Sequence, residues 1–314
     1  MSPPSPEFLA WAGLIGAIAI LLAVDLWVMR GRDGEMTSRA AAVASAFWIG
    51  LALAFGGLLA LTSGGADAGT YLAGYLVEKS LSLDNVFVFL LVFGAFRIAA
   101  NERHRLLSYG IVGALVLRLG FILVGAAALS AFGWLNLVFA AILIWTGWRL
   151  WGGRHDHEAE EKLVAKVRRR LPIADGNNAP GWFTREEGRR VLTASGAVLA
   201  ALIVVDVVFA IDSVPAILAI TDDAYIVFAA NAFALLGLRP LFFLVADLVE
   251  RLYYLKAALA VLLVVIGAKM AAAYWVGKIG PEITLPVIAS ILGVGVVASL
   301  VRSSRTPPDA QPIT

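Results

Sequence analysis

The chain has 314 residues, of which 60% are hydrophobic and 15% are charged, and its mean hydropathy is +0.84. Apolar surface on this scale needs lipid to cover it, which excludes an ordinary soluble domain. The net charge of +2 gives no reason to expect a nucleic-acid partner, and the absence of cysteine excludes disulfides, thiolate metal sites and thiol nucleophiles.

The apolar segments predict nine membrane spans, because a helix needs about 20 apolar residues to cross a bilayer. No basic segment precedes the first run and no cleavage site of small residues follows it, so we expect residues 8–29 to be a retained span and not a signal peptide. The chain is therefore predicted to be an all-α polytopic membrane protein with a single transmembrane domain over residues 1–314. The predicted spans are residues 8–29, 40–62, 72–96, 106–129, 132–151, 192–219, 225–247, 257–276 and 284–301.

Basic residues gather in every second connection between these spans. The opposite connections hold only Lys278. The positive-inside rule then places the N-terminus outside and the C-terminus in the cytoplasm, which requires an odd number of spans. We expect the protein to lie in the inner (plasma) membrane of the cell.

The longest connection, residues 152–191, is predicted to be a cytoplasmic loop. Its segment from His155 to Glu161 carries two histidines among acidic residues, groups that can bind metal, although charge runs in such loops are usually only solvated. A regulatory role and binding of protein partners through this loop stay open. The proline-containing end, residues 302–314, is predicted to be a disordered cytoplasmic tail.

Two parts of the chain, residues 72–151 and 192–276, repeat the same pattern of charged and polar residues. Each part is three predicted helices long, so two consecutive copies must lie upside down relative to each other in the membrane, as in many secondary transporters. Chance similarity of apolar helices is the alternative, but matched charges are harder to attribute to chance. The matched pairs are Glu78 with Asp206, Asp84 with Asp212, Asn85 with Ser213, and Arg118 with Arg239.

Acidic residues at bilayer depth cost several kcal/mol unless they face a partner or water, so these four acids are candidates for function. Six residues separate the acids within each repeat, a rise of about 9 Å along a helix, which is too far for both to hold one ion on a straight helix. We therefore expect the ion to lie between helices, with Pro215 breaking the sixth span beside the carbonyl of Ile211. The predicted metal ligands are Glu78, Asp84, Asn85, Asp206, Asp212 and Ser213, with Asp84 and Asp212 sharing the ion and the other two acids gating or relaying it.

All of these ligands donate oxygen. With no cysteine in the chain and no histidine within a predicted span, magnesium, calcium and manganese keep their usual ligands, whereas copper and zinc lose theirs. Residue chemistry alone thus indicates a hard divalent cation.

Basic residues near the acids are predicted to neutralise them when the metal is absent. These charge-compensating residues are Lys79, Arg118 and Arg239. The alternative is that the charged groups only fasten helices together. Asn231 and Asp25 are predicted to be peripheral to the site, or else ordinary hydrogen-bonding residues between helices.

Three segments, residues 78–85, 212–216 and 236–239, resemble the signature segments of the TerC family, and the resemblance extends over about residues 10 to 300. It implies membership of the LysE-like group of exporters, a helical fold of two repeats, and manganese efflux or delivery of manganese to proteins outside the cytoplasm. It also implies a link to tellurium-ion resistance. The acids of the family's motifs map onto Glu78, Asp84, Asp206 and Asp212.

Together, these features predict a membrane transporter that exports Mn²⁺ in exchange for protons, without organic cofactor and without enzymatic activity. Ca²⁺ and Mg²⁺ remain alternative substrates. A non-transporting assembly or tellurium-resistance factor and an amino-acid exporter are alternative functions. An intramembrane enzyme is disfavoured because no Gly-x-Gly-Asp or His-Glu-x-x-His segment accompanies the acids.

Overall fold

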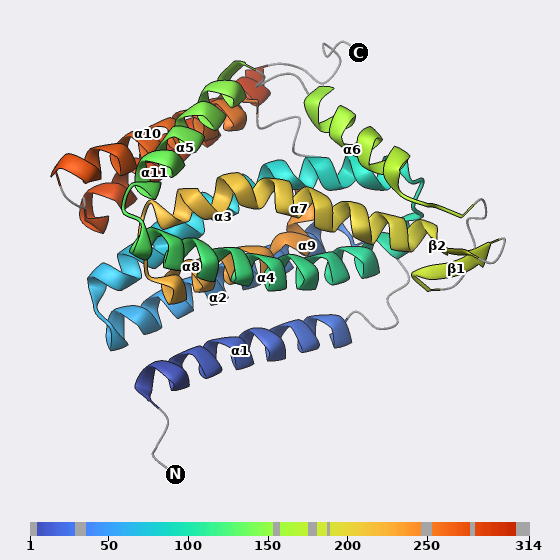
Figure 1. Cartoon of the computed structure of the whole chain (residues 1–314), viewed down its shortest axis with the longest axis horizontal. Coiled ribbons are helices and arrows are strands. Elements are labelled where there is room, and N and C mark those ends of the chain that lie inside the picture. The colour runs from blue at the N-terminus through green and yellow to red at the C-terminus, as the bar shows by residue number, and fades with distance from the viewer. Residues whose placement is uncertain are drawn as a thin grey trace.

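A computed structural model describes residues 5–28, 36–152, 158–174, 181–186, 189–245, 253–276 and 280–305. In these ranges the chain is helical apart from one short antiparallel hairpin (Figure 1). The elements are α1 (Pro6–Val28), α2 (Ser38–Thr62), α3 (Gly65–Ala95), α4 (Ala100–Ala131), α5 (Leu135–Gly152), α6 (Glu158–Arg170), β1 (Phe183–Glu186), β2 (Arg189–Leu192), α7 (Ala194–Leu218), α8 (Ala224–Leu236), α9 (Leu238–Val245), α10 (Leu255–Val276) and α11 (Pro281–Arg305).

Seven helices of the described ranges are long and apolar enough to cross a membrane: α1, α2, α4, α5, α7, α10 and α11. An eighth span results if α8 and α9, which are bent by 41° relative to each other, are counted as one. Helix α3 has 31 residues but carries Glu78, Lys79 and Asp84 along its length. The chain is thus an all-α polytopic membrane protein, as predicted, and the ninth span stays a prediction that depends on α3.

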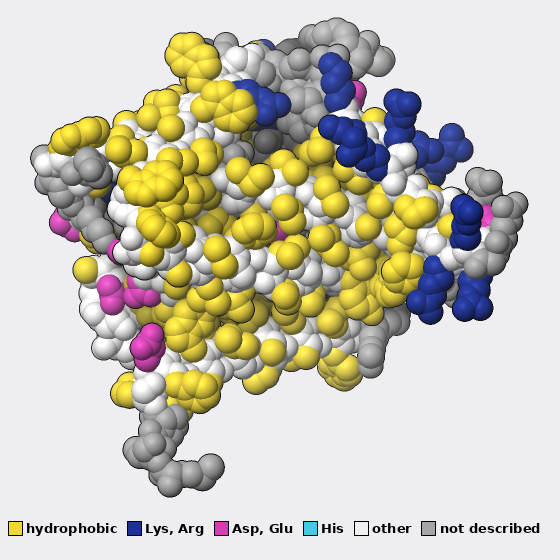
Figure 2. All heavy atoms as spheres, in the orientation of Figure 1, with side chains coloured by type: hydrophobic (Ala, Val, Ile, Leu, Met, Phe, Trp, Pro, Cys, Tyr) yellow, Lys and Arg dark blue, Asp and Glu magenta, His cyan; other side chains and the backbone are white. Residues whose placement is uncertain are grey.

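Large apolar side chains cover the outside of the helices (Figure 2). Leu61, Trp148 and Trp27 are 89%, 79% and 70% exposed. A soluble monomer does not expose apolar surface so widely, but lipid tails cover it at no cost.

The centre of the bundle is formed by α3, α4, α7 and α8 (Figure 1). At one side, α5 and α11 pack against α10, and α11 also packs against α3. Helix α2 packs against α3 and α9, and α1 packs against α8. Helix α8 is buried at every position from Ile226 to Leu236. A helix that is apolar on all sides belongs in the interior, so its sequence explains its central place.

Helices α5 and α10 pack closely, and glycine allows it. A Cβ on Gly147 would lie 2.7 Å from the carbonyl oxygen of Ala260, and a Cβ on Gly267 would lie 2.9 Å from that of Ala140. Gly267 lies 120 positions after Gly147, and Ala260 lies 120 positions after Ala140. The two contacts are therefore equivalent under exchange of the two repeats. An inverted repeat requires such exchange-symmetric contacts, and they support the predicted repeat, which remains a prediction.

The break in the helices differs from the one predicted at Pro215. Helix α7 continues through Pro215 to Leu218, whereas the break falls at Gly237, between α8 and α9. The reason lies in Pro240: its ring has no N–H to donate and pushes against the carbonyl four residues earlier, which belongs to Leu236, the last residue of α8.

The long connection contains α6 and the β1–β2 hairpin, so it is partly structured. Val164 on α6 is buried, and α6 packs against α3 and α7. Residues 153–157, which include His155, and the side chains of Glu158 and Glu160 lie outside the described residues. At the other end of the chain, α11 continues to Arg305, so the predicted disorder from residue 302 is wrong for the first four residues, and residues 306–314 are outside the described ranges.

Charges are segregated between the two ends of the bundle. Figure 2 shows Lys and Arg gathered over α6 and the hairpin and Asp and Glu at the opposite end. The described acids of that end lie at helix N-termini, where a negative charge complements the helix dipole. They are Glu7, Asp67, Asp223 and Glu282, and Asp222 directly precedes Asp223.

Candidate functional site

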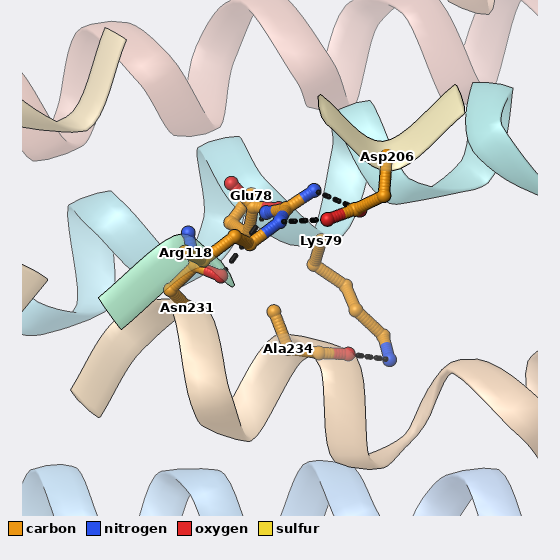
Figure 3. A network of polar contacts seen from close by, with 6 residues as sticks. All are labelled: Glu78, Lys79, Arg118, Asp206, Asn231 and Ala234. Atoms are coloured by element: carbon orange, nitrogen blue, oxygen red, sulfur yellow. Dashed lines mark hydrogen bonds and ion pairs between the residues drawn. The ribbon is translucent and has the colours of Figure 1, made fainter. Parts of the chain in front are cut away.

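Arg118 on α4 lies at the centre of the bundle and is fully buried. Its guanidinium forms an ion pair with Glu78 on α3 and a second one with Asp206 on α7, where Nη2 lies 3.1 Å from Oδ1. Nη1 also donates to Oδ1 of Asn231 on α8 at 3.0 Å (Figure 3). One side chain thus joins acceptors from three other helices.

Helix periodicity brings the acceptors and their neighbours to this point. On α3, spacings of four and three residues place Glu78, Ser82 and Asn85 on one face, and all three are buried. On α7, Asp206 and Ser213 are seven residues apart, which is two turns, and both are buried. The faces of α3 and α7 that carry the repeat-matched residues therefore both turn inward.

Several polar atoms near Arg118 have no hydrogen-bond partner among the described residues. They are Glu78 Oε2, Ser82 Oγ, Ser213 Oγ and Asn231 Nδ2. Ser213 lies beside Glu78, yet neither its hydroxyl nor Glu78 Oε2 completes a hydrogen bond of normal geometry. Unpaired buried oxygens are rare because each costs free energy, so they point to an ion, a water or another conformation that uses them.

Asn231 was predicted to be peripheral to the site or else a hydrogen-bonding residue between helices, and its contact with Arg118 is of the second kind. It is fully buried and binds Arg118 directly. Its place on α8, the most buried helix, is the signal that could have revealed this.

Lys79 does not compensate a described acid. Its Nζ donates to the carbonyl of Ala234 at 3.2 Å (Figure 3), near the end of α8. A Cβ on Gly237 would lie 2.8 Å from this Nζ. The last carbonyls of a helix lack partners and carry partial negative charge, so Lys79 stabilises the break between α8 and α9. Sequence analysis missed this role and the break at Gly237.

Arg239 also differs from its predicted role. Its Nη2 pairs with Asp25 on α1 at 2.5 Å and its Nη1 donates to Ser108 on α4 at 3.1 Å. Arg239 lies on α9, beyond the bend after α8, and it compensates Asp25 instead of Glu78 or Asp206. Asp25 is thus an ion-pair partner of Arg239 on α9.

The side chains of Asp84 and Asp212 lie outside the described residues, although α3 and α7 pass through both positions. Their predicted sharing of an ion therefore stays a prediction. Among the side chains that are described, no three acidic or histidine residues are close enough together to hold a metal. Asn85 is buried at the predicted place on α3.

Comparison with known proteins assigns the family. A family model described as "Integral membrane protein TerC family" matches residues 63–307. The chain belongs to the TerC family. The match includes all four intramembrane acids as well as Arg118, Asn231 and Arg239.

This TerC-family protein resembles several curated relatives over most of its length. It is 43% identical to "Uncharacterized membrane protein STKORF319" of Myxococcus xanthus over 95% of this chain and 93% of that protein. It is 41% identical to "Putative membrane-bound redox modulator Alx" of Escherichia coli (strain K12), over 83% and 85% of the two chains. It is 35% identical to "Thylakoid membrane protein TERC, chloroplastic" of Arabidopsis thaliana, over 90% and 74%.

No solved structure matches the chain. The arrangement around Arg118 therefore rests on the structure described here. Membership of the wider LysE-like group remains a prediction from the resemblance.

Proposed function

We propose that this TerC-family protein is a secondary carrier that exports Mn²⁺ from the cytoplasm through the site around Arg118. One observation carries the proposal: acids from matching positions of the two repeats, Glu78 and Asp206, converge on a single buried arginine.

In the proposed mechanism, Arg118 takes the place of the cation when no metal is bound. Two carboxylates buried without a counter-charge are very costly, so the ion-free carrier needs a built-in cation. A divalent ion that displaces the guanidinium would gain the same carboxylates. The unpaired oxygens of Glu78, Ser82 and Ser213 would supply further ligands.

The ligand chemistry favours a hard cation. Carboxylate, amide and hydroxyl oxygens bind Mn²⁺, Mg²⁺ and Ca²⁺, and the chain has no cysteine to favour softer ions. The choice of manganese among these rests on the family resemblance. We expect Asp84 and Asp212, six residues or about 9 Å further along α3 and α7, to share the ion at a separate position, with Glu78 and Asp206 relaying it.

The choice of export as the direction of transport rests on the family resemblance, whereas the orientation of the carrier rests on the segregation of charge. The basic end of the bundle faces the cytoplasm under the positive-inside rule, which sets the N-terminus outside (Figure 2). Carboxylates that release a metal must take up protons or return to an arginine, so proton exchange and Arg118 are the two ways to reset the carrier.

The description of the E. coli relative as a redox modulator concerns that protein. This chain has no cysteine, so a redox effect through a thiol of its own is excluded. Neither amino-acid export nor an assembly role is favoured by a contact around Arg118.

The test is metal flux into proteoliposomes that contain the purified protein and an entrapped metal indicator. We expect uptake of Mn²⁺ by the wild type and its loss in Glu78→Gln and Asp206→Asn. Each substitution removes a charged ligand worth about 1.5–3 kcal/mol, so affinity falls about tenfold or more. Asp84→Asn and Asp212→Asn are expected to abolish flux as well.

Asp67→Asn is the matched control, because it changes an acid on the same helix as Glu78 but in its first turn, away from the site. Ca²⁺, Mg²⁺ and lysine are compared with Mn²⁺ in parallel. If Glu78→Gln and Asp206→Asn are both folded and both show full Mn²⁺ flux, the assignment of the transport site to these acids is refuted. Lysine flux without metal flux would favour the amino-acid exporter.

A further inference from the structure

A second polar region lies inside the bundle, apart from the Arg118 site. A cavity of about 620 Å³ is enclosed by parts of α1, α2, α4 and α9. Its wall is mostly apolar, but it includes the ion pair of Asp25 with Arg239, the ring of His104 and the hydroxyl-bearing Thr37. The cavity lies where α1 ends and where α2 and α4 begin, which is the end of the bundle assigned above to the cytoplasm.

In this ion pair, Asp25 is partly exposed, and Arg239 has a donor without a hydrogen-bond partner among the described residues. The side chain of Asp25 is 16% exposed, whereas that of Arg239 is 2% exposed. The Nε of Arg239 is buried and has no hydrogen-bond partner among the described residues. A cavity of this size with an unpaired donor in its wall can hold ordered water, and with it a hydrated cation at Asp25.

The cavity leads toward the acid site. Trp48 lines it, and a Cβ on Gly237 would lie 3.0 Å from Cβ of Trp48 and 2.8 Å from Nζ of Lys79. Lys79 in turn is next in sequence to Glu78. Trp48 and Lys79, both beside Gly237 at the break between α8 and α9, therefore connect the wall of the cavity with the part of α3 that carries Glu78.

Helix α1 is loosely held beside this cavity. Only 11% of its apolar stretch is buried. Near its N-terminus, Trp11 packs against the rings of Tyr225 and Phe228 on α8. In its C-terminal half, Leu21 and Leu22 pack against the core, and Asp25 pairs with Arg239. Opening that pair would remove the charged contact and loosen this end of α1.

We propose that this cavity is the cytoplasmic entrance for the transported cation, with Asp25 as its first carboxylate ligand and the Asp25–Arg239 ion pair as the gate that closes it. The proposal rests on the proposed transport function. A cation that reaches Asp25 competes with the guanidinium for the same carboxylate, so arrival of the cation opens the gate. The path then continues past Lys79 to Glu78.

The absence of cysteine makes a direct test practical, because one introduced cysteine is the only thiol in the protein. Ala44→Cys places it in the cavity wall, and Ala46→Cys places it on the exposed surface of the same helix, outside the cavity. The reagent is a positively charged, membrane-impermeant methanethiosulfonate, applied to inside-out vesicles. We expect Ala44→Cys to react at least about ten times faster, because only a thiolate reacts and a lipid-facing thiol stays protonated.

Binding of the cation is read from protection, independently of flux. Mn²⁺ is expected to slow labelling of Ala44→Cys, to lose this effect when Asp25→Asn is added, and to regain it with Asp25→Glu. The Asp25→Glu variant keeps the carboxylate and the ion pair with Arg239, so it remains informative if Asp25→Asn does not fold.

Equal labelling of the two cysteines overturns the entrance, and so does protection by Mn²⁺ that persists in folded Asp25→Asn. Labelling and Asp25-dependent protection in a protein without Mn²⁺ flux would refute transport and leave Asp25 as a cation site. Normal flux with no protection would support the proposed function and refute the entrance.

Discussion

Arg118 holds together buried polar groups that no other described residue satisfies. Its partners come from α3, α7 and α8, and all of them are buried. Removing one member of a buried ion pair is costly mainly because the charge left behind has no partner. The stability of the bundle should therefore depend on the balance of these charges more than on any single one.

Replacing Arg118 by Met tests this dependence. We expect Arg118→Met to destabilise the protein by roughly 3–5 kcal/mol, because Glu78 and Asp206 lose their counter-charge. Adding Glu78→Gln and Asp206→Asn should recover most of the loss. The measurement is thermal unfolding in detergent, with the exposed Arg149→Met as control. A triple variant no more stable than Arg118→Met would contradict the explanation.

For individual residues, the sequence predicted well which charged residues lie in the interior. It predicted their ion-pair partners less well. The intramembrane positions of Glu78, Asp206 and Arg118 were enough to indicate that they meet. The pairing of Arg239 with Asp25 could not be predicted, because it depends on a bend that redirects α9. Asn231 carries no charge, so the pattern of intramembrane charges could not predict its contact with Arg118.

Among whole elements, the pair α5 and α10 shows how closely backbones approach without a hydrophobic driving force between helices. In a membrane, small residues allow this approach, and packing then supplies the attraction. Gly147 faces Ala260 and Val264, while Gly267 faces Ala140 and Ile144. The interface has no space for one additional carbon atom at either glycine.

Alanine at Gly147 should separate these helices. Its Cβ would lie 2.7 Å from a backbone oxygen, which cannot move independently of α10, so we expect Gly147→Ala to cost about 1–3 kcal/mol. Gly50→Ala on α2 is the matched control. Nothing lies within 4 Å of its added Cβ, so stability should be unchanged or up to about 1 kcal/mol higher. Thermal unfolding measures the stability of both variants, and equal stability of the two would refute the close contact.

The helices themselves were largely predictable, since the length of an apolar run is set by the bilayer. Breaks were less predictable. Pro215 and Pro240 both remove a donor, but only Pro240 has a glycine three residues before it. The lack of a side chain at Gly237 lets Lys79 and Trp48 approach the backbone there, and Lys79 stabilises the carbonyl end of α8. Helix α6 and the hairpin lie in a loop without long apolar runs, so the pattern of spans could not predict them.

For the molecule as a whole, the two ends differ in charge. Acids at helix N-termini mark one end, and the arginines of α6 and the hairpin mark the other (Figure 2). The positive-inside rule assigns the basic end to the cytoplasm. This orientation remains a prediction, and it determines on which side the cavity at Asp25 opens.

Single cysteines at the two ends test the orientation. Ser63→Cys lies in the turn between α2 and α3, and Ala99→Cys lies between α3 and α4; both positions are exposed. We expect a membrane-impermeant maleimide to label Ser63→Cys in spheroplasts and Ala99→Cys only in inside-out vesicles. The reverse pattern would invert the topology and place the opening of the cavity at Asp25 outside the cytoplasm.

The arginine at the centre of the bundle also bears on which ions the carrier would ignore. A cell holds far more potassium than manganese, and an empty pocket of carboxylates would attract either. Potassium offers one charge and no hydrogen bonds, so it gains little by displacing a guanidinium that already supplies one charge and several hydrogen bonds to Glu78, Asp206 and Asn231. Only an ion of higher valence brings more positive charge to the carboxylates than the guanidinium does. In the proposed carrier, Arg118 would therefore discriminate by valence before any ligand geometry selects among the divalent ions.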